Sequence, residues 1–180
     1  MRSKFIIAGT LMALALTGCG SGISSGTEES FVAGNGALTF IAPAHRSQAP
    51  KISGATIDGK NFTLAAGEIA VINIWASWCA PCRAEAPTLA ALSKKYSKVA
   101  FLGILTRDNN VAANAFVKRF AIPYPTLADD EILLHFKGAM IASAIPTTLI
   151  IDKNGKVAAR ISGEITVASL STLIERVTSE

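Results

Sequence analysis

Two cysteines stand three positions apart in the stretch "ASWCAPCRAE". Cys79 and Cys82 could bind a metal, form a permanent disulfide or act as a redox couple. A structural zinc site needs about four nitrogen or sulfur ligands, and His45 and His135 are each isolated in the sequence. Arg83 stands where a haem-attachment motif needs histidine. A permanent disulfide closing so short a loop would constrain the unfolded chain little. The spacing therefore favours a reversible dithiol couple.

The residues around the cysteines predict different roles for the two thiols. Pro81 follows Ala80 between them and suits the first turn of a helix, because it has no N–H to satisfy. Cys79 would then lie at the helix N-terminus, where free N–H groups and the dipole favour a thiolate. We expect Cys79 to be the exposed nucleophile, and Cys82 to be more buried and to react second. Trp78 is either a flank that shields the sulfur and contacts clients, or a half-buried aromatic.

The pattern of apolar residues predicts the elements that position this pair. A continuous apolar run over residues 69–75 fits a strand buried on both faces, directly before the cysteines. Strands alternate with helices along the chain, which indicates a central sheet covered on both sides. Ligand and active sites in such sheets lie beyond the carboxyl ends of strands. The other predicted elements are a hairpin at 52–66 around Asp58-Gly59, helices at 83–97 and 110–120, a strand at 99–105, a hairpin at 146–162 around Asn154-Gly155, and a C-terminal helix with Val167, Leu170, Ile174 and Val177 as its apolar face.

The start of the chain predicts export. Arg2 and Lys4 precede an apolar run that ends at Leu16, which is too short to span a bilayer and suits a signal peptide. The following "LTGC" resembles the lipobox of bacterial lipoproteins, in which the cysteine, here Cys19, carries the lipid. The alternative is an ordinary signal peptide with a chance cysteine. We therefore expect a signal peptide at 1–18, a flexible tether and N-terminal extension at 19–48, with linker over residues 20 to about 35, and one domain at 49–180, held outside the cytoplasm by lipid.

The charge balance excludes some partners. The chain has 17 basic and 13 acidic residues, and the predicted signal peptide removes two basic ones, so the mature net charge is 15 − 13 = +2. Such a balance predicts neither nucleic-acid binding nor a polybasic membrane patch. With Cys19 lipidated, Cys79 and Cys82 are the remaining thiols, and none is left for a separate structural disulfide.

The motifs together resemble the thioredoxin superfamily. They are "WCAPC" after a buried strand, Pro87 five residues beyond the second cysteine, and "IPTTLIID" near the end. The resemblance implies an α/β thioredoxin fold, with a central mixed β-sheet flanked by helices. It also implies that Pro146 is cis, stands opposite the cysteines and shapes a client groove with Ile145, Trp78, Ala80 and Pro81. From about Ala49 onward the chain resembles the extracytoplasmic TlpA/ResA branch. Three features point to this branch: the "NIWASWC" lead-in, the glutamate after "CAPCRA", and an inserted helix–strand segment between Thr106 and Ala144. We also expect an N-terminal β-hairpin extension.

Asn73 and Glu85 raise the question of proton transfer. Thioredoxins carry a buried aspartate at the position of Asn73, and an amide cannot titrate. Glu85 matches the acid that the ResA type places near its cysteines, and it follows Cys82 by three residues on the same helix face. The alternative is that Glu85 only complements the helix N-terminus. The remaining acids, including Asp108, Asp129, Asp130 and Glu131, read as solvated loop and helix-cap residues.

The resemblance implies a membrane-anchored thiol-disulfide oxidoreductase without metal or organic cofactor. Its implied partners are client proteins with disulfides, such as apocytochromes c, and a membrane thiol transporter as electron donor. We expect a reductase, because the dipeptide Ala80-Pro81 offers no charge or side-chain donor that would stabilise a thiolate. The alternatives are an oxidase that makes disulfides in exported proteins, a peroxiredoxin-like peroxidase, although Ala76 replaces the threonine of that motif, and a non-enzymatic chaperone lipoprotein.

Overall fold

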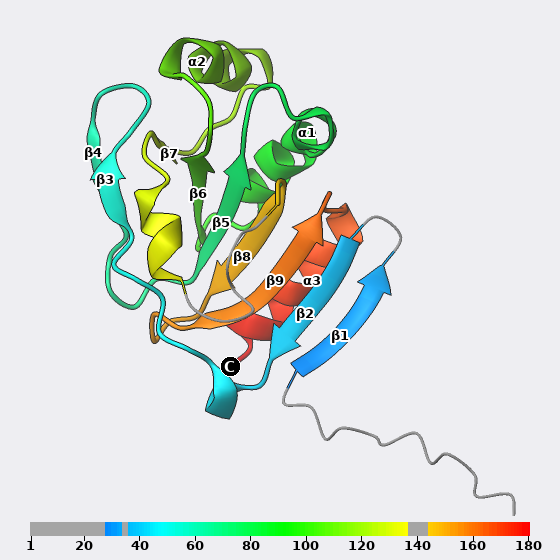
Figure 1. Ribbon diagram of the computed structural model, residues 1–180. Coiled ribbons are helices and arrows are strands. Elements are labelled where there is room, and N and C mark those ends of the chain that lie inside the picture. The colour runs from blue at the N-terminus through cyan, green and yellow to red at the C-terminus, as the bar shows by residue number, and fades with distance from the viewer. Residues whose placement is uncertain (1–27, 34–35, 137–143) are drawn as a thin grey trace, which may run out of the picture.

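A seven-stranded mixed sheet forms the centre of the molecule in the computed structural model, which describes residues 28–33, 36–136 and 144–180 (Figure 1). The strand order is β1-β2-β9-β8-β5-β6-β7, in which β5, β6 and β7 are parallel and the other neighbours antiparallel. The strands of this sheet are β1 (Glu28–Ala33), β2 (Gly36–Ile41), β5 (Ala70–Trp75), β6 (Ala100–Leu105), β7 (Thr126–Leu127), β8 (Thr147–Ile151) and β9 (Val157–Gly163).

The strand that precedes the cysteines lies in the middle of this sheet. All six residues of β5 are buried, as its continuous apolar run predicted. Because side chains alternate along a strand, Asn73 and Trp75 point to one face while Ile72 and Ile74 point to the other. Ile72 and Ile74 pack in the apolar core of their face, whereas Trp75 packs with the cysteines. The alternation therefore directs Asn73 toward the helix that begins at the cysteines.

Two helices, α1 (Ala80–Lys95) and α3 (Val167–Thr178), cover the Asn73 face of the sheet, and α2 (Asn110–Arg119) packs near its edge (Figure 1). Helix α1 begins at Ala80 with Cys79 as its N-cap, as Pro81 predicted and three residues before the range taken from the apolar pattern, and Pro87 lies inside the helix. The predicted apolar face of the C-terminal helix was wrong at one position: Val167 is 57 % exposed. It is the first residue of α3, next to the capping residue Thr166, and projects into solvent, while Leu173 completes the buried stripe.

The opposite face is covered by the first predicted hairpin and by part of the insert. Strands β3 (Ser53–Ala55) and β4 (Asn61–Thr63) form a separate two-stranded sheet, which touches β7 through a bridge between Thr56 and Leu127. Gly59 and Gly155 take φ values of 82° and 72° at the two predicted turns, a conformation that glycine adopts without strain. The expected helix–strand insert is present as α2 and β7, followed by the 3-10 helix η2 (Glu131–His135).

The N-terminal extension belongs to the central sheet. Strand β2 pairs with β9, and β1 pairs with β2, so residues 28–33 form a strand where a linker was predicted. Arg46, after the short 3-10 helix η1 (Pro43–His45), is 7 % exposed and fastens this segment. Its guanidinium lies 2.9 Å from Asp152 and 2.5 Å from Glu180, and its Nε donates to the carbonyl of Ile41.

The described residues contain no helix long and apolar enough to cross a membrane. The predicted signal peptide and Cys19 lie outside the described residues.

Candidate active site

The two cysteines form a disulfide at the N-terminus of α1. Their Cα atoms are 5.3 Å apart. The Cys79 sulfur accepts a hydrogen bond from the backbone N–H of Cys82 at 3.2 Å, so it lies on the unpaired N–H groups of the first helical turn. Cys79 and Cys82 are 4 % and 2 % exposed. In this disulfide form the expected exposure of Cys79 is therefore not found, because the bond holds both sulfurs against the core.

Trp78 provides the exposed surface next to this disulfide. It is 57 % exposed, so one part of the ring is packed and the other is accessible. Its indole N–H donates to the carbonyl of Arg107 at 3.1 Å, and the Arg107 guanidinium lies 6.0 Å from the ring centre. Ala80 and Pro81 are also exposed. An apolar ring with a fixed orientation therefore stands beside the sulfurs, accessible to another molecule.

The segment that leads into β8 also packs against the cysteines. The peptide bond between Ile145 and Pro146 is cis, as the resemblance implied. Pro146 is buried, and Ile145 packs against the cluster that contains Cys79 and Cys82. The turn is held by the Thr147 hydroxyl, which donates to the carbonyl of Ala144 at 2.7 Å. The segments expected to form a client groove thus meet at the disulfide.

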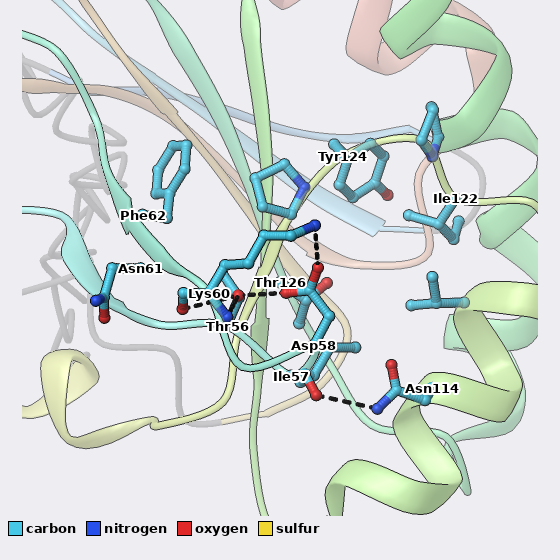
Figure 2. Close-up of a pocket in the computed structure, with 13 residues that line it drawn as sticks. Thr56, Ile57, Asp58, Lys60, Asn61, Phe62, Asn114, Ile122, Tyr124 and Thr126 are labelled. Carbon is cyan, nitrogen blue, oxygen red and sulfur yellow. Dashed lines mark hydrogen bonds and ion pairs between the residues drawn. The ribbon is translucent and has the colours of Figure 1, made fainter.

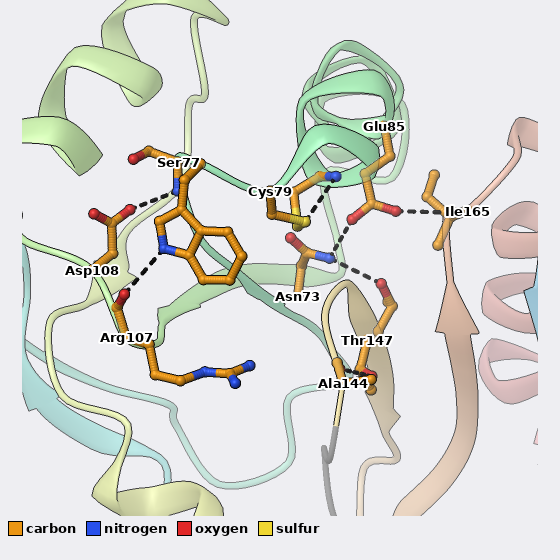
Figure 3. The surroundings of a disulfide bond; sticks show 12 residues. Asn73, Ser77, Cys79, Glu85, Arg107, Asp108, Ala144, Thr147 and Ile165 are labelled. Atoms are coloured by element: carbon orange, nitrogen blue, oxygen red, sulfur yellow. Dashed lines mark hydrogen bonds between the residues drawn. A yellow bond between two sulfur atoms is a disulfide. The ribbon is translucent and has the colours of Figure 1, made fainter.

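Glu85 is buried on the inner face of α1, with 1 % of its surface exposed. One carboxylate oxygen accepts from the Asn73 amide at 2.8 Å and the other from the backbone N–H of Ile165 at 2.9 Å (Figure 3). Burial, aided by the nearby charge of Glu164, raises the pKa of Glu85 to about 7, although the two hydrogen bonds oppose the shift. Glu85 is thus a buried, hydrogen-bonded carboxyl group rather than a solvent-exposed acid at the helix terminus.

Asn73 connects the Glu85 carboxyl group to the surroundings of Cys82, the cysteine expected to react second. Its amide also donates to the Thr148 hydroxyl at 3.1 Å, directly across from it in the β5–β8 register. Asn73, Cys82 and Tyr124 line one small cavity of about 10 Å³. Burial and the nearby Glu85 carboxylate raise the pKa of Tyr124, so it stays neutral. A cavity of this size is at the lower limit for one water molecule.

Sequence reasoning missed Thr148 and Tyr124 in this cluster. Thr148 is brought into this cluster only by the pairing of β5 with β8. Tyr124 is brought into it only by the path of the insert. A polar residue inside an apolar strand, such as Thr148 in "TTLII", was the available signal.

Asp108 and Asp130 hold the loops at this end of the sheet and are not simply solvated. Asp108 accepts from the backbone N–H groups of Ser77 at 2.6 Å and Asn109 at 2.8 Å. Burial opposes its charge, but these bonds outweigh burial and lower the pKa of Asp108. Asp130 accepts from the hydroxyl of Thr106. Asp108 therefore braces the loop that carries Trp78 and Cys79.

A larger pocket of about 400 Å³ lies between the β3–β4 hairpin and the insert (Figure 2). Asp58 and Lys60 form an ion pair at 2.8 Å on its wall. Ile122 and Tyr124 line both this pocket and the small cavity at Cys82, so they separate the two. Within the described part of the chain, no three His, Cys, Asp or Glu side chains gather as a metal site.

Comparisons with known proteins agree with this geometry. Residues 44–174 match the Redoxin family. The thiol-disulfide oxidoreductase ResA of Geobacillus thermodenitrificans is 30 % identical over 142 residues, covering 76 % of this chain and 79 % of the relative. The DsbE homologue of Paracoccus denitrificans, a thiol:disulfide interchange protein, is 33 % identical over 126 residues, 66 % of each chain. The structure of a secreted thiol-disulfide isomerase from Corynebacterium glutamicum superposes with a TM-score of 0.74 at 28 % identity, covering 79 % and 92 % of the two chains.

A mixed sheet flanked by helices, with a Cys-x-x-Cys disulfide capping a helix beside a cis-proline, defines a thioredoxin-fold thiol-disulfide oxidoreductase of the TlpA/ResA type. The chain belongs to the Redoxin family.

Proposed function

We propose that this protein reduces disulfides in client proteins outside the cytoplasm, through the Cys79–Cys82 couple. The Cys79 thiolate attacks a client disulfide and forms a mixed disulfide, and one client sulfur leaves as a thiolate. Cys82 then loses its proton and attacks the Cys79 sulfur, which releases the second client thiolate. Two electrons pass to the client, and the protein is left with the disulfide described above.

The placement of each sulfur supports this division of work. The Cys79 sulfur accepts from an N–H of the first turn of α1, and such donors stabilise a thiolate. Cys82 shares its cavity with Asn73, whose amide is bonded to Glu85. With a pKa of about 7, Glu85 can take the proton that Cys82 must lose. The link from the Glu85 carboxyl group through Asn73 to the cavity at Cys82 is the observation that carries the proposal.

The direction follows from what surrounds Cys79. A strongly oxidising couple needs a greatly stabilised thiolate. Ala80 and Pro81 supply neither charge nor a side-chain donor, and ionisation of Glu85 would disfavour a second negative charge in the site. We therefore expect a reduction potential closer to that of thioredoxin, about −270 mV, than to a strong oxidant at about −120 mV.

The partners and location extend the proposal. An exported reductase needs continual re-reduction, so we propose a membrane thiol transporter as electron donor and clients that include apocytochromes c. Lipid on Cys19 would hold the domain at the bacterial cell membrane. A relative named as secreted, together with the lipobox resemblance, supports this location.

The test is equilibration of the purified protein with glutathione, combined with thiol trapping in growing cells. We expect a potential near that of thioredoxin and a couple that is largely reduced in cells. A potential near the oxidant end, with the couple trapped mostly as disulfide, would establish the oxidase instead.

A further inference from the structure

A hollow of about 240 Å³ lies beside the disulfide, between the first turns of α1 and the helix α2. Ser77, two residues before Cys79, lines one side, and Arg83, directly after Cys82, lines another. Arg119, at the end of α2, completes the charged part of the wall. A peptide whose cysteine sits at Cys79 would therefore place a flanking segment over this hollow.

The charge around the hollow is positive. Arg83 and Arg119 are exposed, and within the described residues neither has a carboxylate partner. Helix α2 carries no acidic residue. The nearby carboxylate of Asp108 is turned onto two backbone N–H groups, and Glu85 is buried on the inner face of α1. Two guanidinium groups are thus left to attract an anionic partner.

The floor of the hollow is apolar and firmly packed. The rings of Phe116 and Phe120 lie 4.7 Å apart, and Phe116 stacks on the buried Trp75 at 4.3 Å. The Arg119 guanidinium lies 5.6 Å from the Phe120 ring, an arrangement that orients it without neutralising it. A planar guanidinium held in this way can bind a carboxylate through two parallel N–H bonds.

We propose that this hollow binds an acidic stretch next to the disulfide of the client, with aspartate or glutamate on the arginines and aliphatic side-chain parts on Phe116 and Phe120. The inference rests on the proposed function, since it selects which clients that reaction reaches. Charge pairs at an exposed rim act mainly on the association rate, so the preference would weaken with rising salt.

The experiment is a single-turnover reduction with the fully reduced protein. Two peptides carry the same intramolecular disulfide, flanked in one by Asp and Glu and in the other by Asn and Gln. The variant is Arg119→Gln, because Arg83 adjoins Cys82 and its loss would alter the thiol chemistry itself. The matched control is Lys118→Gln, which removes the same charge one residue away, outside the lining of the hollow.

We expect the wild-type protein to reduce the acidic peptide about three- to tenfold faster at low salt, with the difference lost as salt rises. Arg119→Gln should lower the rate for the acidic peptide about two- to fivefold and leave the neutral peptide unchanged, while Lys118→Gln should leave the ratio between the peptides unchanged. Equal rates for the two peptides, or equal effects of the two substitutions, would overturn the docking proposal alone. Reduction of neither peptide would overturn the proposed reductase.

Discussion

Replacing Glu85 by glutamine should remove a pH dependence of stability that this one side chain creates. A shift of the Glu85 pKa from 4.5 to about 7 corresponds to about 3 kcal/mol, at about 1.4 kcal/mol per pKa unit. Because the folded pKa lies above the unfolded one, the folded state holds the extra proton between these values. The stabilisation is therefore complete below about pH 4.5 and is lost as the pH rises to about 7.

The substitution also has a cost that does not depend on pH. Both carboxylate oxygens of Glu85 accept, one from Asn73 and one from Ile165. The protonated carboxyl group can also accept on both oxygens, whereas glutamine keeps a single acceptor, so one of the two donors would face an NH₂ group at a cost of about 1–3 kcal/mol. We expect Glu85→Gln to be less stable than wild type at pH 4.5 and to equal or exceed it at pH 8.

Urea unfolding of the oxidised protein measures this, because disulfide-bonded cysteines do not titrate. The difference in free energy of unfolding between wild type and Glu85→Gln should change by about 3 kcal/mol from pH 4.5 to pH 8. As a control, Glu164→Gln should keep most of this dependence and move it to lower pH, because the Glu164 charge raises the Glu85 pKa. Parallel stability curves for wild type and Glu85→Gln would refute the reasoning. In the reduced protein, the pH profile of thiol reactivity should lose its inflection near 7.

Five further substitutions test other parts of the molecule. Cys82→Ala should accumulate mixed disulfides with clients on non-reducing gels and Cys79→Ala should not; faster alkylation of Cys82 than Cys79 at neutral pH would reverse the assignment. Cys19→Ala should release the protein from membranes or block its processing, and a mature, membrane-bound variant would contradict the lipid anchor. Asn73→Ala removes a donor to Glu85, so the inflection in the thiol pH profile should move above 7, whereas an unchanged profile would exclude coupling. Arg46→Ala leaves Asp152 buried without its cation and should cost about 3 kcal/mol in urea unfolding, and a loss below about 1 kcal/mol would show that the pair is dispensable.

The sequence predicted the parts of the fold that depend on local patterns. The buried strand β5, both glycine turns and the helix after Cys79 follow from apolar runs, turn residues and capping. Val167 was misplaced, because helical periodicity shows which residues share a face but not where the helix leaves the core. Strand β1 was missed, because its pairing partner β2 joins the sheet through β9, far away in the sequence.

The candidate site, like the fold, has parts that the sequence predicted and parts that it did not. Cys79, Cys82 and Pro146 stand in recognisable motifs, so they were found. The environment that raises the Glu85 pKa depends on Asn73 from β5 and on the N–H of Ile165 before α3, which come from distant parts of the chain. No local sequence pattern indicates that Glu85, Asn73 and Ile165 lie together in the fold.

Arg46 ties the N-terminal extension to the rest of the molecule, since its partners Asp152 and Glu180 come from the β8–β9 turn and the last residue. With β2 hydrogen-bonded along β9, the segment from Gly36 to Phe40 should unfold together with the central strands. Its amide hydrogens should therefore exchange with solvent as slowly as those of the central strands, and a protease acting on the native protein should find no cleavage site between Leu38 and Phe40.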